Sequence, residues 1–405
     1  MNTIVDAFIS HPEKVHFTFD HGNGHSREYP GIQLAQEAAG LALRFRELGV
    51  SPGDRVAVVV PTSEPLLRTI VAAWFCRAAI VVLPHRLSGT RSSASGEKLA
   101  RMLQKVTPTV VVGYAAVEDL IRSCLGSQSN YIAAEFMPEV PEASLDSVHY
   151  PELNDVAVLQ FSSGSTRESR PVIIRHAQLR ANLINSESPT NSNEDDIYCS
   201  WLPIYHDFGL VCSFEFPLFF GRRSVLVPTE AFISEPLAWI RIMEERGITM
   251  SAVPPFSLDL VGAAARGAGK RFRLPRLRYM WLAAEPIFVN RVLNFAKCIE
   301  GDSHALSFLR PAFGLAESVI GVTVTHADSK FSWISIDEAD YRKGVIKLSG
   351  DEHSGSIRIT SCGRTISTTD LKICDGDGRL LSLSLIHISE PTRRTPISYA
   401  VFCLK

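Results

Sequence analysis

The chain has 405 residues, of which 45% are apolar and 21% charged, and its formal net charge is -2 at pH 7. This length is too great for one ordinary core and indicates two or three packed units of a globular protein. A net charge this small argues against electrostatic attraction to nucleic acid or anionic lipid as the main activity.

The ends and apolar stretches of the chain show no targeting signal. Residues 1–12 lack a basic stretch followed by an apolar core, so no secretory signal is expected. The most apolar stretch, 70–84, contains Arg77 and is shorter than the roughly 20 residues of a membrane span. We therefore expect a cytoplasmic protein. Its eight cysteines include no Cys-x-x-Cys pair and are expected to be free thiols.

Short β-branched runs alternate with amphipathic segments along the chain. Strands are predicted at residues 55–60, 80–83, 109–113, 156–161, 197–202, 224–227, 248–253 and 279–283. Helices are predicted at residues 64–76, 97–106, 117–124, 176–184, 235–246 and 288–299. This rhythm predicts an α/β fold of two subdomains with mostly parallel sheets. We place the first subdomain at 1–190, the second at 191–321, and an insertion with the start of a β-rich part at 322–382.

The sequence of residues 383–405 does not resemble that of an ordinary protein segment. Residues 383–393 read LSLIHISEPTR and residues 397–404 read ISYAVFCL. Both resemble the conceptual translation of adapter DNA from sequencing libraries, and the three residues between them fall where a sample index would be read. We interpret 383–405 as an artefact tail behind a protein sequence that stops near Ser382, the alternative being an ordinary amphipathic tail.

A loop of small hydroxyl-bearing residues follows the strand predicted at 156–161. It contains Ser162, Ser163, Gly164, Ser165 and Thr166, followed by Arg167. Small residues let backbone N–H groups approach an anion, hydroxyls add donors, and one hydroxyl can reach a magnesium ion. The Walker pattern is absent, because no Gly-Lys-Ser/Thr follows. Taken alone, such a loop is more often a plain turn.

A histidine follows the strand predicted at 197–202. The segment is Trp201-Leu202-Pro203-Ile204-Tyr205-His206-Asp207-Phe208-Gly209. Pro203 ends the strand, so His206 lies at its carboxyl end, where open α/β sheets bind ligands. There it can donate to a carboxylate or phosphate. An isolated histidine would more often be a helix cap or a core residue. The apolar run 211–220 could line an acyl-chain pocket or be plain core.

Two further segments each contain a glutamate. The first is Ala283-Ala284-Glu285-Pro286, in which Glu285 could equally face a helix N-terminus. The second is Phe313-Gly314-Leu315-Ala316-Glu317, which alone also reads as a helix start. The carboxylate of Glu317 suits magnesium, which prefers oxygen ligands and is shared with substrate phosphates.

Together the four segments resemble, in order and spacing, the motifs of the adenylate-forming superfamily, most closely those of fatty acyl-AMP ligases. The loop resembles the phosphate loop Tyr-Thr-Ser-Gly-Ser-Thr-Gly-x-Pro-Lys-Gly, from which Arg167, Ser169 and Pro171 depart. The histidine segment resembles Trp-Leu-Pro-Leu-Tyr-His-Asp-Met-Gly. The last two resemble Gly-Ala-Glu-Pro and Tyr-Gly-Leu-Ala-Glu. Residues 333–344 resemble the insertion that separates these ligases from acyl-CoA synthetases.

The resemblance implies a fold and an activity. The fold would be the large N-terminal domain of the adenylate-forming fold: two α/β subdomains with mostly parallel sheets, a β-rich insertion, and no small C-terminal domain. The activity would be that of a ligase. ATP would activate a fatty acid carboxylate to acyl-adenylate with release of pyrophosphate, for transfer to an acyl carrier protein or a polyketide or nonribosomal peptide synthase module.

The resemblance also implies residue roles, with ATP and Mg²⁺ as cofactors. His206, Thr166 and Glu317 would be catalytic, and Glu317 and Thr166 would hold the metal. Nucleotide and phosphate would be bound by Ser162, Ser163, Gly164, Ser165, Thr166, Arg167, Ala284, Glu285, Pro286, Phe313, Gly314 and Leu315. The family's ribose-binding aspartate and catalytic lysine fall beyond this sequence, so we expect the chain as written to be weak or inactive. The alternatives are an acyl-CoA synthetase of the same superfamily and a non-catalytic adenylation-like binding module.

Overall fold

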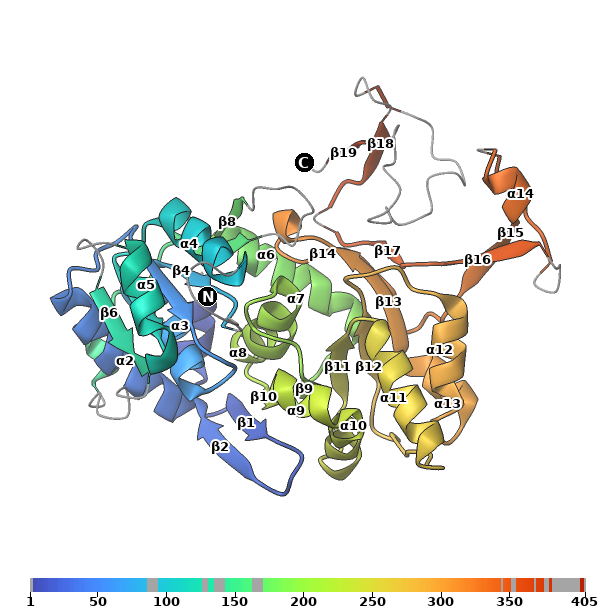
Figure 1. Cartoon of the computed structure of the whole chain (residues 1–405), viewed down its shortest axis with the longest axis horizontal. Helices are drawn as coiled ribbons and strands as arrows, with labels where there is room; N and C mark the ends of the chain where they lie inside the picture. The colour runs from blue at the N-terminus through green and yellow to red at the C-terminus, as the bar shows by residue number, and fades with distance from the viewer. Residues whose placement is uncertain are drawn as a thin grey trace. The chain divides into compact units, whose positions relative to one another are not determined.

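The structure is a computed structural model of the chain, shown in Figure 1. It describes residues 3–85, 94–125, 130–134, 143–161, 170–343, 345–350, 355–367, 369–374, 379–380 and 401–403. The chain divides into two compact units. Unit 1 comprises Met1–Leu183 and Glu194–Ala231, and unit 2 comprises Ile184–Asn193 and Phe232–Lys405. The subdomain ranges expected from the sequence stay a prediction, while the α/β class is confirmed.

The first sheet of unit 1 has the strand order β6-β5-β3-β4-β7-β8. Its strands are β6 (Asn130–Ala133), β5 (Val110–Gly113), β3 (Arg55–Val59), β4 (Ala79–Val82), β7 (Val156–Phe161) and β8 (Pro171–Arg175). All neighbours are parallel except β7 and β8, which are antiparallel. Parallel strands need crossover helices, and these helices bury both faces of the sheet.

The helices around this sheet are α2 (Gly31–Glu47), α3 (Glu64–Trp74), α4 (Ala94–Val106) and α5 (Glu118–Leu125). One face of the sheet, with Ala57, Val81 and Val111, packs against buried residues of α4 and α5. The alternate residues Val56 and Ile80 are equally buried and point to the other face, where α3 lies against β3 and β4. Burial on both faces explains why these strands are continuous apolar runs in the sequence.

Unit 1 also contains the strands β9 (Ile197–Ser200), β10 (Arg223–Leu226), β1 (His16–Asp20) and β2 (Ser26–Pro30), in this order. The first three are parallel, and β2 forms an antiparallel hairpin with β1. Between β9 and β10 the chain forms the short helix α7 (Asp207–Gly209), a π-helix (Leu210–Glu215) and α8 (Phe216–Phe220). α1 (Ile4–Ser10) packs on α8, and α6 (His176–Glu187) follows β8.

Unit 2 is built on the parallel strands β11 (Met250–Val253), β12 (Tyr279–Leu282) and β13 (Leu309–Gly314). β14 (Gly321–Val324) and β17 (Arg364–Thr365) continue this sheet in antiparallel pairing. The helices α10 (Pro236–Glu245), α11 (Phe256–Gly267), α12 (Val289–Ala296) and α13 (Asp302–Phe308) pack on one another in chain order. Figure 1 shows α11, α12 and α13 side by side, and α9 (Thr229–Ser234) precedes them in the chain.

The expected β-rich insertion is an antiparallel hairpin of β15 (Trp333–Asp337) and β16 (Ser356–Thr360), with the short helix α14 (Glu338–Tyr341) between the strands. In the region interpreted as an artefact tail, the described residues form β19 (Val401–Cys403), which pairs with β18 (Lys372–Cys374).

Free thiols, as expected, are found at six of the eight cysteines: Cys76, Cys124, Cys199, Cys212, Cys298 and Cys362. No helix in the described part of the chain is long and apolar enough to cross a bilayer.

Candidate functional site

The hydroxyl-rich loop Ser162–Thr166, with Arg167, lies outside the described residues. Its two ends are described and lie next to each other, because Phe161 at the end of β7 is paired with Pro171 at the start of β8. The loop is therefore the connection of an antiparallel pair. It leaves the sheet at the carboxyl end of β7, where ligands bind in open α/β sheets.

Gln160, the residue before Phe161, is buried at 4% exposure. Its amide Nε2 donates a 3.1 Å hydrogen bond to the main-chain carbonyl of Tyr205. The strand that leads into the loop is thereby held to the turn that contains His206. We did not single out Gln160 from the sequence, although a polar residue in an apolar strand directly before a hydroxyl-rich loop is a signal worth noting.

His206 lies in a turn after β9, as the position of Pro203 predicts. It is the N-cap of α7, and its backbone N–H donates to Pro203 O at 3.1 Å. The imidazole Nδ1 lies 2.7 Å from Asp207 Oδ1, which also accepts the backbone N–H of Phe208 at 2.7 Å. Nδ1 also lies 3.3 Å from the backbone nitrogen of Phe208, and it accepts this N–H as the helix cap when it carries no proton. With a proton on Nδ1 the imidazole donates to Asp207 instead and leaves Nε2 for a ligand. The cap position of His206 is compatible with a binding role in either form.

Gly209 explains why this turn is so tight. A Cβ at this position would lie 2.2 Å from Pro203 O, so no other residue fits without moving the backbone. The glycine of the motif therefore brings the start of α7 close to the end of β9 and sets the position of His206.

The apolar run 211–220 is largely core in unit 1. Val211, Phe214, Phe216 and Leu218 are at most 2% exposed. The ring of Phe214 lies 5.5 Å from that of Phe17 and 6.2 Å from that of Trp74. Of the two interpretations of this run, these contacts favour plain core over an acyl-chain pocket.

One carboxyl group is buried in the same run. Glu215, the last residue of the π-helix, is 1% exposed, and its Oε1 has no hydrogen-bond partner. Burial raises the pKa of Glu215 from 4.5 to about 8. A carboxyl in this environment is therefore protonated at neutral pH.

In unit 2, Glu285 follows β12 through Ala284, which has φ of +74°. A left-handed alanine costs on the order of 1–3 kcal/mol, so this turn is strained. The Oε1 atom of Glu285 accepts the backbone N–H of Phe256, the first residue of α11. It also accepts a 2.9 Å hydrogen bond from Arg291, which pairs with Asp259 at 2.6 Å. The helix N-terminus that we considered for Glu285 is that of α11.

The segment that contains Phe313 and Glu317 leaves β13 through a compact turn. A Cβ on Gly314 would lie 1.8 Å from Ile320 O, and the pairing of β13 with β14 shifts between Phe313 and Gly314. Leu315 N donates to the same carbonyl at 3.0 Å. The segment is thus a strand end followed by a single turn of 3-10 helix, Ala316–Ser318, rather than the start of an α-helix.

Glu317 is exposed in this 3-10 turn. Within the described residues its carboxylate forms no hydrogen bond or ion pair, so it is available to a ligand. Because β12 and β13 are neighbouring parallel strands, Glu285 and Phe313 lie at the carboxyl ends of adjacent strands. The structure thus groups the motifs in two pairs: the loop ends with the His206 turn in unit 1, and Glu285 with the segment 313–317 in unit 2.

Comparison with known proteins identifies the family. The family described as "AMP-binding enzyme" matches residues 7–384, a range that ends within the first residues of the suspected artefact tail. A putative acyl-CoA synthetase of Caulobacter vibrioides is 24% identical over 357 residues, which are 87% of this chain and 62% of that protein. The long-chain-fatty-acid–AMP ligase FadD32 of Mycolicibacterium smegmatis is 25% identical over 343 residues, 81% of this chain and 53% of that protein.

A third relative is the medium-chain-fatty-acid–[acyl-carrier-protein] ligase TtuA of Teredinibacter turnerae. It is 26% identical over 228 residues, 56% of this chain and 35% of that protein. The chain therefore spans less than two thirds of the length of these curated relatives.

Solved structures share the fold. A structure from a study of fatty acyl-adenylate ligases of E. coli and L. pneumophila superposes with a TM-score of 0.84 at 24% identity, covering 94% of this chain and 70% of that chain. The fatty acyl-adenylate ligase of L. pneumophila in complex with acyl adenylate and pyrophosphate gives 0.81 at 22% identity, covering 98% and 71%. The expected resemblance is confirmed, and the chain belongs to the AMP-binding enzyme family.

Proposed function

We propose that this chain contributes nucleotide- and substrate-binding residues to the adenylation step of a fatty acid–AMP ligase. In this step a carboxylate oxygen of the fatty acid attacks the α-phosphate of ATP, the α–β phosphoanhydride bond breaks, and acyl-adenylate and pyrophosphate result. The observation that carries the proposal is the hydrogen bond between Gln160 and Tyr205. It ties the strand that leads into the hydroxyl-rich loop to the turn that contains His206.

The proposed roles follow from chemistry and placement. The amides and hydroxyls of Ser162–Thr166, with Arg167, would surround the phosphates. Asp207 would keep Nδ1 of His206 protonated, so that a second proton on Nε2 could be donated to the substrate carboxylate or a phosphate oxygen. Ala284, Glu285 and Pro286 would lie along the adenine, and the ring of Phe313, with Gly314 and Leu315, would stack near the nucleotide. Positioning and charge neutralisation would supply most of the rate enhancement.

The described residues fit a magnesium ion that is shared with substrate phosphates. Glu317 offers an exposed carboxylate with no recorded partner, and Thr166 would add a hydroxyl. No group of three or more His, Cys, Asp or Glu side chains in the described part of the chain could hold a metal on its own. This suits Mg²⁺, which usually binds to one or two carboxylates, waters and phosphate oxygens. When bound, the ion would neutralise charge on the phosphates.

The acyl acceptor is proposed to be the thiol of an acyl carrier protein or of a polyketide or nonribosomal peptide synthase module. The hairpin of β15 and β16 supports this choice over coenzyme A, because it occupies the place of the expected insertion. The name of TtuA, an acyl-carrier-protein ligase, agrees with it. The first relative reported above is named an acyl-CoA synthetase, so coenzyme A remains the competing acceptor.

The test uses stable mimics of the acyl-adenylate, in which a sulfamoyl group replaces the phosphate. The 405-residue chain is titrated calorimetrically with mimics that bear a long aliphatic, an acetyl or an aryl group. We expect the aliphatic mimic to bind at least tenfold more tightly than the other two. Preference for the acetyl or aryl mimic, or no binding at all, would refute the proposal.

A further inference from the structure

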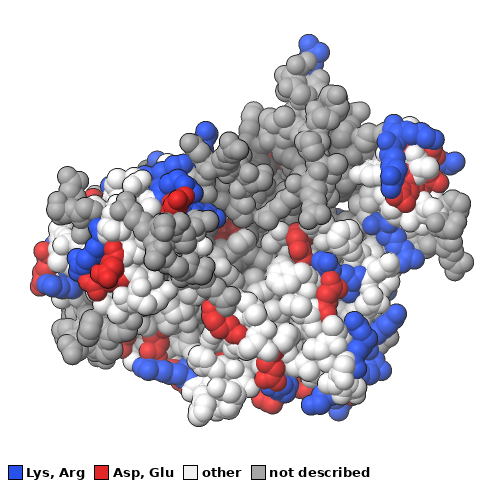
Figure 2. Space-filling view, in the orientation of Figure 1, with Lys and Arg blue, Asp and Glu red and all other residues white. Residues whose placement is uncertain are grey.

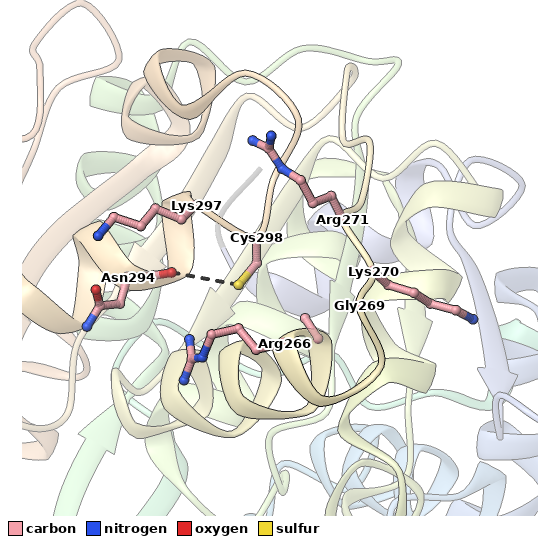
Figure 3. Close-up of a pocket in the computed structure, with 8 residues that line it drawn as sticks. Arg266, Gly269, Lys270, Arg271, Asn294, Lys297 and Cys298 are labelled. Atoms are coloured by element: carbon pink, nitrogen blue, oxygen red, sulfur yellow. Dashed lines mark hydrogen bonds between the residues drawn. The ribbon is translucent and has the colours of Figure 1, made fainter.

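A pocket in unit 2 is lined by none of the residues proposed to bind the nucleotide. It has a volume of about 380 Å³, within the range of small-molecule sites, and lies between the carboxyl ends of α11 and α12 (Figure 3). The lining residues are Ala265, Arg266, Gly269, Lys270, Arg271, Asn294, Lys297 and Cys298. Four of them are cations and none is a carboxylate.

The pocket and Glu285 belong to opposite ends of α11. Glu285 accepts a hydrogen bond at the amino end of this helix, at Phe256, whereas the pocket begins at Ala265 near its carboxyl end. A 12-residue helix is about 18 Å long, so the pocket is separate from the contact between Glu285 and the amino end of α11.

Cations at helix carboxyl ends are common, because they offset the partial negative charge of the last carbonyls. That charge is roughly half an elementary charge per helix, or about one for the two helices together. Four lining cations exceed it several-fold. Arg266, Lys270 and Lys297 form no ion pair with a described residue. Helix ends therefore do not account for the whole of this positive charge.

Two carboxylates near the pocket form ion pairs with arginines that do not line it. Glu235, whose pKa is lowered chiefly by Arg241 and to a smaller extent by Lys270, forms a 2.6 Å ion pair with Arg241. Glu300 pairs with Arg273 at 3.1 Å. The rim thus keeps an excess of positive charge, and Figure 2 shows Lys and Arg side chains gathered at this end of unit 2.

The backbone fixes the direction of these cations. After α11, the exposed residues Lys270, Arg271 and Arg273 are interleaved with Phe272 and Leu274, which are 4% and 3% exposed. The apolar side chains anchor the segment, so the cations must point to solvent. Figure 3 shows Arg266, Lys297, Lys270 and Arg271 around the pocket, with Cys298 at its centre. The thiol of Cys298 donates to the carbonyl oxygens of Asn294 at 3.7 Å and Gly262 at 3.8 Å.

We propose that this pocket binds a phosphate-bearing anion through Arg266, Lys270 and Lys297. Guanidinium and ammonium groups are the side chains that recognise phosphate, and long exposed side chains can turn inward without any movement of the backbone. The anion is either a free phosphate compound or the headgroup of an anionic lipid. The net charge of the whole chain, -2, does not reveal this local excess of positive charge.

The test compares the full chain with the variant R266Q/K270Q/K297Q. The control is K98Q/R101Q/K105Q on α4, which removes three exposed cations from unit 1. One arm measures co-sedimentation with phosphatidylglycerol vesicles, and with phosphatidylcholine vesicles for comparison, at fixed ionic strength. The other arm titrates inorganic phosphate. We expect the wild type to bind in at least one arm, and the arm that responds identifies the source of the anion.

In that arm the pocket variant should bind on the order of 100-fold more weakly, since each lysine or arginine near an anionic surface contributes about fivefold. The control and the charge-conserving variant R266K/K270R/K297R should bind as the wild type does. If the triple variant does not fold, K270Q/K297Q should still weaken binding roughly 30-fold. No wild-type binding in either arm, or equal weakening in the pocket variant and the control, would overturn the proposal.

Discussion

The side-chain amide of Gln160 donates a 3.1 Å hydrogen bond to the main-chain carbonyl of Tyr205. The two residues are 45 positions apart, in two different motifs of the sequence. One motif supplies the loop proposed to bind phosphates and the other contains His206. A single buried amide therefore holds the strand end before the loop to the turn that contains His206.

Replacing Gln160 with leucine should loosen this connection. The lost hydrogen bond costs about 1 kcal/mol, or more if a buried acceptor is left unsatisfied. We expect the affinity for a fatty acyl-adenylate mimic to fall about tenfold, as measured by calorimetry. The matched control is Gln104→Leu on an exposed position of α4. Unchanged affinity in a folded Gln160→Leu protein would show that the two motifs are positioned independently.

Glu285→Ala should lower the free energy of unfolding by about 1–2 kcal/mol, because the first backbone N–H of α11 and Arg291 both lose an acceptor. Glu285→Gln keeps an acceptor oxygen and should lose less. Chemical denaturation measures both changes. A role along the adenine predicts that Glu285→Gln also weakens binding of the acyl-adenylate mimic, by more than the loss of stability explains. Wild-type affinity in Glu285→Gln would leave Glu285 with a structural role alone.

Glu317→Ala should leave stability unchanged, because the carboxylate has no described partner to lose. The substitution is expected to weaken the binding of Mg²⁺ together with ATP. The increase in ATP affinity on addition of Mg²⁺ should shrink at least tenfold, whereas the exposed control Glu13→Ala should keep it. A Glu317→Ala protein that retains the full magnesium effect would remove Glu317 from the metal site.

Glu215 should make stability depend on pH. Its pKa is about 8 in the folded chain, against an ordinary value of 4.5. Between these values the folded state holds a proton that the unfolded state has released, so stability falls as the pH rises from 4.5 to 8. The full loss is about 5 kcal/mol. Glu215→Gln keeps the shape of the protonated acid and should flatten this part of the stability curve.

Denaturation of the wild type and Glu215→Gln at pH 5.5, 7 and 8.5 measures this difference. The free energy of unfolding of Glu215→Gln, relative to that of the wild type, should increase at each step to higher pH. Parallel curves would mean that Glu215 titrates normally or that water reaches its side chain.

Removing residues 383–405 should leave the thermal midpoint unchanged to within about 1 °C. An artefact tail has no evolved contacts, and the described pairing of β18 with β19 involves three residues of each strand. Short isolated strand pairs contribute little stability. A fall of several degrees in the midpoint would assign the tail a structural role.

Much of the fold could be predicted from the sequence. The strands β3, β4 and β5 are apolar runs because both faces of the sheet are buried, and their helices show a clear periodic face. The helix α2 was not predicted. It buries small residues such as Ala35, Ala38 and Ala39, and small side chains give little contrast between the faces of a helix. The strand β13 was missed because Arg310 and Pro311 interrupt its apolar run.

The site could be predicted only in part. The resemblance of the motifs identified His206, Glu285 and Glu317. His206 and Glu285 also follow strands that were predicted, whereas the strand before Glu317 was not predicted. The partners of these residues, such as Arg291 and the N-terminus of α11 for Glu285, come from other elements of the fold. The role of Gln160 depends on a contact with a residue 45 positions away, which no local pattern shows.

The central claim is that this chain binds a fatty acyl-adenylate through the residues of its motifs. The most direct measurement is calorimetric titration of a long-chain acyl-sulfamoyl-adenosine into the 405-residue chain and into the variants His206→Ala and Phe313→Leu. We predict one ligand per chain for the wild type and affinity at least tenfold weaker in both variants, with folding retained. No binding by the wild type, or wild-type affinity in both variants, would contradict the claim.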